Sequence, residues 1–372
     1  MSRGPATDDP GDDPDVLAAD LEADIEAELA GADHPMRGTR WWAWVLRVAI
    51  SLVLLWLLIR KVADVQLVDL LPEWTAATIS WLVVALVLTL TGIVLAALRW
   101  DQVLAAMALP RPTLRRLTRH YFAGQAVSNV LPTTIGGDVL RAARLAGDTG
   151  DASDSFASLI IERLTGWLVL PLLTFIGFAL DAQVRGMGRP ATIALAISAG
   201  TLVGLVGILV VADHPRLGGR FTQRQGWRRF LGSVHLGVSR LRRHPGSAAR
   251  VVAAGCVYQL VLVLAATAAA RALSIDLGVT AVLALYPAVL VTQVLPIGIA
   301  GLGVREGALV YFLGPLGVPH DQAVALGLLL FTLNLLVSVL GVPALVAGRG
   351  ARTRTVPPPQ PDASRGPRAD TR

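Results

Sequence analysis

Apolar residues follow one another along most of this chain in long runs separated by polar or charged stretches. A helix crosses a hydrocarbon core of about 30 Å with roughly 20 residues, so runs of this length are typical of membrane spans. The runs predict six spans, at residues 42–59, 78–98, 156–180, 191–212, 251–272 and 321–347. The predicted fold class is therefore an all-α, polytopic integral membrane protein.

Two further apolar stretches do not fit as simple spans. Residues 121–131 form a run of eleven residues, which as a helix rises only about 16 Å, half a membrane. This run breaks at Pro132 and the pair Gly136 and Gly137. The second stretch, residues 281–295, is followed by an apolar segment at 304–316, and it breaks at Pro296, Gly298, Gly301 and Gly303. Both stretches are predicted to be re-entrant hairpins or broken helices.

The two broken stretches are related in sequence. They share the spacing V-x-x-V-L-P-x-x-x-[GA]-G-x-x-x-R, and a gapless overlay places Asn129, Pro132, Gly137 and Arg141 on Gln293, Pro296, Gly301 and Arg305. Three predicted spans separate the copies, so the second copy enters the membrane from the opposite side. The repeat elements lie near 120–180 and 281–347. Inverted repeats of glycine-broken helices are typical of transporters that bind substrate near the bilayer midplane.

Composition and charge agree with a membrane protein. The chain has 53% hydrophobic and 16% charged residues, which is too apolar for soluble domains. Its net charge of +6 comes from basic residues clustered between spans, so anionic lipid is expected as a contact and nucleic acid is not. The arginine-rich stretches 99–119 and 213–250 are predicted to be cytoplasmic.

The two ends of the chain differ from the membrane domain at residues 41–348. Residues 1–40 are predicted to be a disordered acidic tail, and residues 349–372 a disordered tail rich in Pro and Arg. Both termini are expected on the cytoplasmic side of the cell membrane.

Motifs for cofactors and catalysis are absent from the sequence. Cys256 is the single cysteine, the six histidines lack metal-ligand spacing, and no P-loop or GxSxG occurs. We therefore expect no metal, no cofactor and a translocase rather than an enzyme.

Charged residues follow the first break. The segment DVLRAARL resumes as a helix after Gly137, so its free N–H groups and dipole favour an anion. Asp138, Arg141 and Arg144 follow at three-residue spacing, on one side of this helix. The pattern suits a phosphate or carboxylate headgroup held by Arg141. Alternatively, Asp138 and Arg141 pair at the cytoplasmic surface, and for Asp138 the two interpretations carry equal weight.

Four more ionisable residues lie within apolar surroundings. Arg305 and Glu306 are costly at such depth unless they face a partner or a cavity, although near the outer interface both would snorkel. Glu162 and Arg163 are adjacent, so they occupy different helix faces and need separate partners. We expect Glu162 to face Arg141 or Arg144. Arg163 is either part of the same site or an interfacial anchor.

The chain resembles the lysylphosphatidylglycerol synthase transmembrane family at NVLPTTIGGDVLRAARL, ASLIIERLTG and LPIGIAGLGVREGALVYFLGPLGV, over residues 40–348. The resemblance implies movement or handling of a polar lipid, which is aminoacylated phosphatidylglycerol in the two-domain members. The positions that match the family motifs are Asn129, Pro132, Gly136, Gly137, Asp138, Arg141, Glu162, Arg163, Gly301, Gly303, Arg305 and Glu306.

One departure from the two-domain members concerns the end of the chain. Only a short tail follows Ala347, without an aminoacyl-transferase domain, so lysyl transfer is not expected. The expected function is translocation or transport of a polar, anionic or aminoacylated lipid, with a membrane phospholipid or lipid-linked molecule as partner. The alternatives are a membrane-embedded transferase acting on a polyprenyl-phosphate-linked substrate and a scaffold that recruits partners through its tails.

Overall fold

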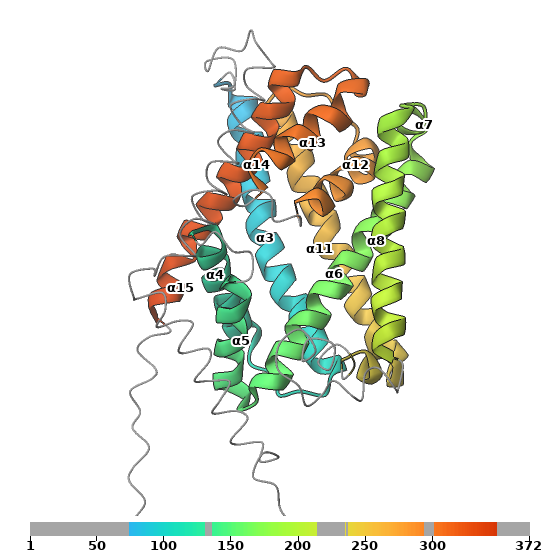
Figure 1. Ribbon diagram of the computed structural model, residues 1–372. Helices are drawn as coiled ribbons and strands as arrows, with labels where there is room; N and C mark the ends of the chain where they lie inside the picture. Colours follow the sequence, from blue (N-terminus) through green and yellow to red (C-terminus); the bar gives the residue numbers. More distant parts are fainter. Residues whose placement is uncertain (1–73, 131–135, 214–234, 236, 294–300, 348–372) are drawn as a thin grey trace, which may run out of the picture.

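The computed structural model describes residues 74–130, 136–213, 235, 237–293 and 301–347. Within these ranges the chain is helical, and five helices are long and apolar enough to cross a membrane (Figure 1). The five are α3 (Ala76–Ala106), α6 (Ala152–Leu180), α8 (Arg189–Asp213), α11 (Pro245–Ala272) and α14 (His320–Leu340). Each overlaps one predicted span, which confirms a multi-pass α-helical membrane protein. The predicted span at 42–59 lies outside the described residues.

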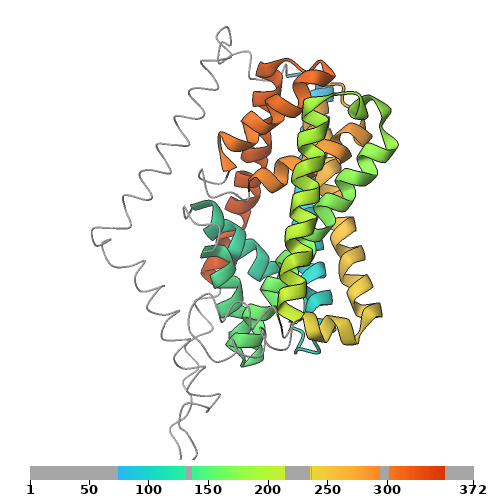
Figure 2. The same cartoon turned by 45° about the vertical axis from the view of Figure 1, so that its right-hand side comes forward.

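Four shorter helices form two pairs at the predicted breaks. The first pair is α4 (Leu114–Val130) and α5 (Gly136–Thr149), and the second is α12 (Val279–Thr292) and α13 (Val304–Leu313). In both views of the ribbon, α4 and α5 lie in the lower half of the molecule, and α12 and α13 lie in the upper half (Figures 1 and 2). The breaks at 131–135 and 294–300 lie outside the described residues, and the inverted relation of the pairs stays a prediction.

The chain also forms shorter elements. They are α7 (Ala182–Arg185), a 3₁₀ turn (Gly314–Leu316) and α15 (Val342–Ala347), and residues 237–243 are helical as well. Asp181 caps α7 by accepting from the backbone N–H of Gln183 at 3.0 Å.

Small residues let the helices pack closely. α3 lies along α11, where a Cβ on Gly92 would stand 3.2 Å from Leu262 Cδ2. The last turns of α11 are rich in alanine, and Ala266, Ala268 and Ala269 are buried in the largest core cluster. Association of helices in lipid relies on such close packing because the solvent is as apolar as the side chains. α8, in contrast, keeps Val203 and Val210 exposed, as a lipid-facing helix does.

The boundary of α3 differs from the prediction. The helix does not end at Leu98 but continues to Ala106, and Arg99, Trp100 and Asp101 in its last turns are buried. The prediction placed Arg99 after the end of this span, in a loop, which is wrong. Burial of a charged side chain in a helix requires a partner of opposite charge beside it, and Glu162 is that partner for Arg99.

The last predicted span, at 321–347, coincides with a stretch at His320–Ala344 that is long and apolar enough to cross a membrane. It is not one continuous helix, because α14 ends at Leu340 and α15 begins at Val342. At the junction, a Cβ on Gly341 would overlap the backbone carbonyl of Phe122 in α4. The close approach of α4 therefore coincides with the break.

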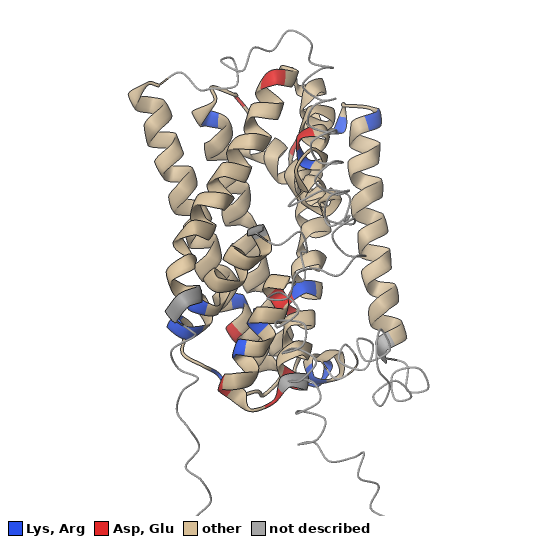
Figure 3. Ribbon diagram, turned by 60° about the vertical axis from the view of Figure 1, so that its left-hand side comes forward, with Lys and Arg blue, Asp and Glu red and all other residues tan. Residues whose placement is uncertain are grey.

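Ionisable residues concentrate toward the two ends of the molecule. Long middle sections of the helices are free of charge, and more of the charged positions lie at the lower end than at the upper end (Figure 3). The lower end carries the charged cluster described next.

Candidate functional site

Glu162 on α6 is the centre of a buried charged cluster. Its side chain is 2% exposed, and Oε1 accepts hydrogen bonds from Arg99 on α3 and from Tyr121 Oη on α4 at 2.6 Å. Its other oxygen, Oε2, lies 3.4 Å from Arg141 Nη2 on α5. Four helices thus meet at one carboxylate, and Glu162 faces Arg141 as the sequence predicted.

Asp138 is the second carboxylate of this cluster. It lies in the first turn of α5, accepts from Arg141 Nη1 at 3.2 Å and pairs with Arg163. Arg163 and Glu162 therefore have separate partners, as their different helix faces require. Arg141 contacts both carboxylates and so links Asp138 to Glu162. We refer to Arg99, Tyr121, Asp138, Arg141, Glu162 and Arg163 as the α5–α6 cluster.

The α5–α6 cluster has more positive than negative charge. Within the cluster, three guanidinium groups face two carboxylates, so the cluster itself carries one positive charge when all are ionised. Arg163 has a 41% exposed side chain, but Arg99 and Arg141 are buried, and binding of an anion beside them would offset part of the cost of burying their charge.

Aromatic rings contact the two buried arginines of the cluster. Arg141 Cζ lies 3.6 Å from the Tyr121 ring centroid and 4.6 Å from that of Trp100. Arg99 Cζ lies 4.9 Å from the Tyr258 ring centroid. Cation–π contacts stabilise a guanidinium without using its N–H groups, which stay available for hydrogen bonds.

Several of these N–H groups have no partner. Arg99 Nε and Nη1 and Arg141 Nε are buried and make no hydrogen bond with any described residue. The two side chains are only 7% and 6% exposed. Buried donors are nearly always paired in folded proteins, so three free guanidinium donors in one cluster indicate a ligand that accepts hydrogen bonds.

Glycines make room for the two arginines. A Cβ on Gly124 of α4 would stand 2.7 Å from Arg141 Cδ, and a Cβ on Gly166 of α6 would stand 2.6 Å from Arg99 Nη1. A Cβ on Gly137 would overlap the Gly124 carbonyl and the Ser128 hydroxyl. The sequence identified Gly136 and Gly137 as a break, and the structure adds that Gly137 brings α5 against α4.

The outer ends of α4 and α5 are joined by a second ionic group. Asp148 accepts from His120 Nε2 at 2.9 Å and pairs with Arg116. Burial lowers the pKa of His120 below 6.5, although Asp148 opposes this effect. Arg144, which was expected to face a ligand with Arg141, donates to the carbonyl of Ala344 in α15 at 3.0 Å. It therefore ties α5 to the C-terminal helix.

Arg305 and Glu306 form a separate pair at the start of α13. Arg305 Nη2 donates to Glu306 Oε1 at 2.7 Å, and the backbone N–H of Gly303 donates to Glu306 Oε2 at 2.6 Å. Gly303 has a φ of 86°, which glycine adopts without strain. Arg305 and Glu306 are 4% and 0% exposed, so they do not snorkel to a surface. We call this group the α13 pair.

Neighbouring residues fix the α13 pair. A Cβ on Gly327 of α14 would stand 2.7 Å from Glu306 Cγ, so glycine again makes room for a buried charge. Arg305 Cζ lies 5.6 Å from the Phe331 ring centroid. Unlike the α5–α6 cluster, the α13 pair is neutral, and no hydrogen bond or ion pair between described residues joins the two groups.

The remaining predicted residues divide into two groups. Gly136 begins α5, and Gln293 packs its side chain against Gly301, whose Cβ would stand 3.0 Å from Gln293 Cγ. Pro132 and Pro296 lie outside the described residues, as does the side chain of Asn129. That the predicted residues bind a substrate stays a prediction.

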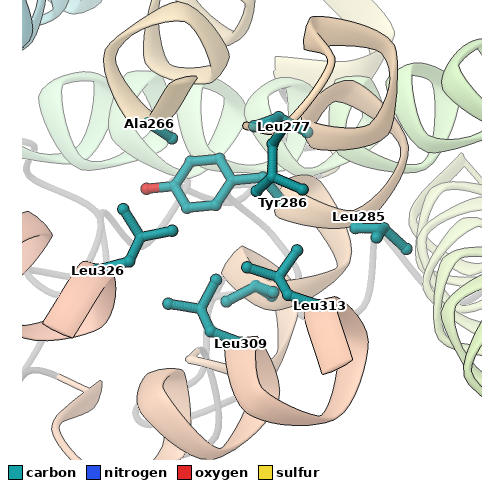
Figure 4. A pocket seen from close by; sticks show the side chains of 9 residues that line it. Ala266, Leu277, Leu285, Tyr286, Leu309, Leu313 and Leu326 are labelled. Atoms are coloured by element: carbon teal, nitrogen blue, oxygen red, sulfur yellow. The ribbon is translucent and has the colours of Figure 1, made fainter. Parts of the chain in front are cut away.

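An enclosed cavity between α11, α12, α13 and α14 is a poor candidate for a headgroup site. Its walls are apolar, with the ring of Tyr286 near Ala266 and Leu326 (Figure 4). The volume of about 10 Å³ holds at most one water molecule. The cavity is therefore a packing defect rather than a ligand site.

Arg99, Trp100 and Tyr121 belong to the site but were not predicted from the sequence. The available signal was the segment RWD at residues 99–101, where an ionisable residue follows an apolar run without a turn residue. Arg99 was used only to predict which side of the membrane the stretch lies on. Its pairing with Glu162, 63 residues away, cannot be recognised from the neighbouring sequence.

The fold and the site define a multi-pass α-helical membrane protein with ionic groups buried between its helices. More particularly, the chain belongs to the lysylphosphatidylglycerol synthase transmembrane family. The family model described as "Lysylphosphatidylglycerol synthase TM region" matches residues 44–341, most of the chain. Comparison with curated proteins and with solved structures gave no match.

Proposed function

We propose that this protein translocates a polar lipid with an anionic phosphate across the cell membrane and binds that phosphate at the α5–α6 cluster. The observation that carries the proposal is the set of three buried guanidinium N–H groups of Arg99 and Arg141 without partners. A phosphate offers several acceptor oxygens, and the planar guanidinium matches their geometry.

The charge of the cluster favours an anion over a cation. The surplus positive charge lies beside the first turn of α5, where free N–H groups and the helix dipole add to the positive potential. Asp138 and Glu162 do not oppose this, because each already accepts from arginine. An aminoacylated headgroup would place its ammonium group against Asp138 and its phosphate against Arg99 and Arg141.

Translocation rather than mere binding is supported by the two pairs of short helices. They lie in opposite halves of the molecule, and each ends in a helix with a buried arginine near its start, Arg141 in α5 and Arg305 in α13. In transporters with inverted repeats, broken helices of this kind alternately open one site to either side. The sequence repeat and the family assignment support the same mechanism.

Liposome reconstitution tests the proposal. The purified protein is expected to accelerate the exchange of a fluorescent phosphatidylglycerol between leaflets, measured by dithionite quenching. Arg99→Ala and Arg141→Ala should each lower the rate roughly tenfold or more, because a hydrogen bond to a charged group contributes about 1.5–3 kcal/mol. Arg305→Ala should also lower it, since the α13 pair would form the opposite half of the path.

Arg111→Ala is the matched control. Arg111 pairs with Asp101 near the same end of the molecule but has a half-exposed side chain, so its loss should leave the rate unchanged. Normal exchange in folded Arg99→Ala and Arg141→Ala would rule out the proposed site. Lipid extracts of a deletion strain that lack a modified lipid, with normal leaflet distribution, would favour the membrane-embedded transferase instead.

A further inference from the structure

α4 has two different faces. One carries Arg116 and His120, which bind Asp148 of α5. Residues 115, 118, 119 and 122 recur at helical spacing on another face, which does not point to α5. This second face has a composition of its own, with two arginines, a threonine and a phenylalanine.

A groove runs along this second face, where α4 meets α3. Its volume is about 500 Å³, and its lining residues are Val94, Leu114, Arg115, Thr118, Arg119 and Phe122. The lining is mainly apolar, with the two guanidinium groups as its only charges. The groove is separate from the α5–α6 cluster, with which it shares no residue.

The two arginines of the groove have no counter-charge within the part of the chain that the structure describes. Arg111 and Arg116, close to them in sequence, pair with Asp101 and Asp148, whereas neither Arg115 nor Arg119 has an ion pair with a described residue. They are four residues apart on a helix, so their side chains are neighbours and can both reach one anion. The groove thus presents two unneutralised charges beside apolar walls.

The groove opens on a face of α3 that suits contact with lipid. Val83, Val87 and Val94 are about half exposed on this helix, which has the composition of a membrane span. Arg115 and Arg119 lie within the arginine-rich stretch predicted to be cytoplasmic, where the leaflet carries anionic headgroups. An occupant must therefore place a negative charge next to a hydrocarbon chain, which a soluble anion or an acidic peptide does not.

We propose that the α3–α4 groove binds an anionic phospholipid of the cytoplasmic leaflet. The phosphate lies between Arg115 and Arg119, and an acyl chain packs against Val94, Leu114 and Phe122. The site does not depend on the proposed translocation, because it uses none of the residues of the α5–α6 cluster.

Photo-cross-linking in nanodiscs tests this proposal with the full chain. Nanodiscs contain phosphatidylcholine with a trace of photoreactive phosphatidylglycerol, or the photoreactive phosphatidylcholine of the same acyl chains, and cross-linked peptides are mapped by mass spectrometry. The phosphatidylglycerol probe should label the peptides of α3 and α4 that border the groove. Labelling by the phosphatidylcholine probe there should be roughly tenfold lower, as two arginines near a surface each attract an anionic lipid.

Three variants define the site. Arg115→Ala/Arg119→Ala should abolish the preference for phosphatidylglycerol at the groove. Arg243→Ala/Arg250→Ala, which removes two exposed arginines at the start of α11, should keep it. Val94→Trp keeps both charges but fills the groove from a lipid-exposed position, and should reduce labelling by both probes.

The outcomes separate the occupants. An unchanged preference in the Arg115→Ala/Arg119→Ala variant would overturn the proposal, as would competition by glycerophosphate at the same concentration as the lipid. Absence of labelling at the groove in the wild-type chain would overturn it as well. Loss of exchange in Arg141→Ala with intact groove labelling would separate this site from the translocation site.

Discussion

Glu162 holds together three helices other than its own. It accepts from Arg99, Tyr121 and Arg141, and its removal would leave buried Arg99 without a carboxylate and Arg141 with Asp138 alone. The energetic weight of such a residue comes from the groups that it leaves unpaired, more than from the bonds themselves.

We expect Glu162→Ala to destabilise the protein by about 3–5 kcal/mol, which is the usual cost of breaking a buried ion pair by removing one partner. Thermal unfolding of the detergent-solubilised protein measures this. The control is Asp154→Asn, which removes a partly exposed carboxylate 3.4 Å from Arg240 and should cost less than about 1 kcal/mol. Equal losses in the two variants would contradict a central role for Glu162.

His120, which binds Asp148 between α4 and α5, makes the stability of this contact depend on pH. Its pKa is lowered by burial, with Asp148 opposing and Arg144 and Arg116 adding to the shift. His120 therefore binds a proton at a higher pH in the unfolded chain than in the folded chain. The folded state has its full stability above about pH 6.5 and loses part of it as the pH falls below that value.

The melting temperature of the wild-type protein should consequently decrease as the pH is lowered from about 7 toward 5. His120→Gln keeps a donor toward Asp148 but removes the titration, so its melting temperature should change less over the same range. A variant that follows the wild-type curve would assign the effect to another group.

At the scale of elements, α4 and α5 depend on contact between glycines. Gly124 and Gly137 lie against each other, and Gly124 also contacts the stem of Arg141. Backbone carbonyls occupy part of this space, so the helices must separate to admit a methyl group. α4 and α5 can thus approach closely because both contact residues are glycines, and this approach brings Arg141 to Glu162.

Gly124→Ala and Gly137→Ala should each destabilise the protein by about 1–3 kcal/mol, the cost of overpacking a close contact. They should also lower lipid exchange, because separation of α5 from α4 moves Arg141. Gly147→Ala is the control on the same helix: a Cβ there meets nothing within 4 Å, and alanine favours the helix. Tm and exchange rate are measured together, and an unstable Gly147→Ala would refute the packing explanation.

At the scale of the whole molecule, the two pairs of short helices connect to the long helices at opposite ends. α5 ends and α6 begins at the lower end, whereas α11 ends and α12 begins at the upper end (Figure 1). The arginine distribution predicts that the lower end is cytoplasmic. The proposed translocation requires this arrangement, because the two ionic groups must face opposite sides of the membrane.

Single-cysteine labelling tests the orientation. In a Cys256→Ala background, Ala249→Cys near the start of α11 should react with an impermeant maleimide only after the cells are opened. Val279→Cys at the start of α12 is about half exposed and should react in intact cells. The opposite pattern would invert the molecule, and the same accessibility for both would contradict the topology.

The sequence was sufficient for much of the fold. Five of the six predicted spans coincide with long helices, and both predicted breaks separate short helices. The contact between Glu162 and Arg141 was also predicted. These features follow from hydrophobicity, glycine and proline, and the cost of burying a charge, which act through the residue itself and its near neighbours.

Other features depended on which helices become neighbours. Arg99 was assigned to a loop, the adjacent Arg305 and Glu306 were not expected to pair, and the division of α14 from α15 at Gly341 was not predicted. Each depends on a surface supplied by a distant segment, such as α6 beside Arg99 or α4 beside Gly341. The sequence by itself thus determined where the chain enters the membrane and where its helices break, because transfer into lipid is a local property. Only the tertiary structure decided which charges meet, because that depends on the packing of whole helices.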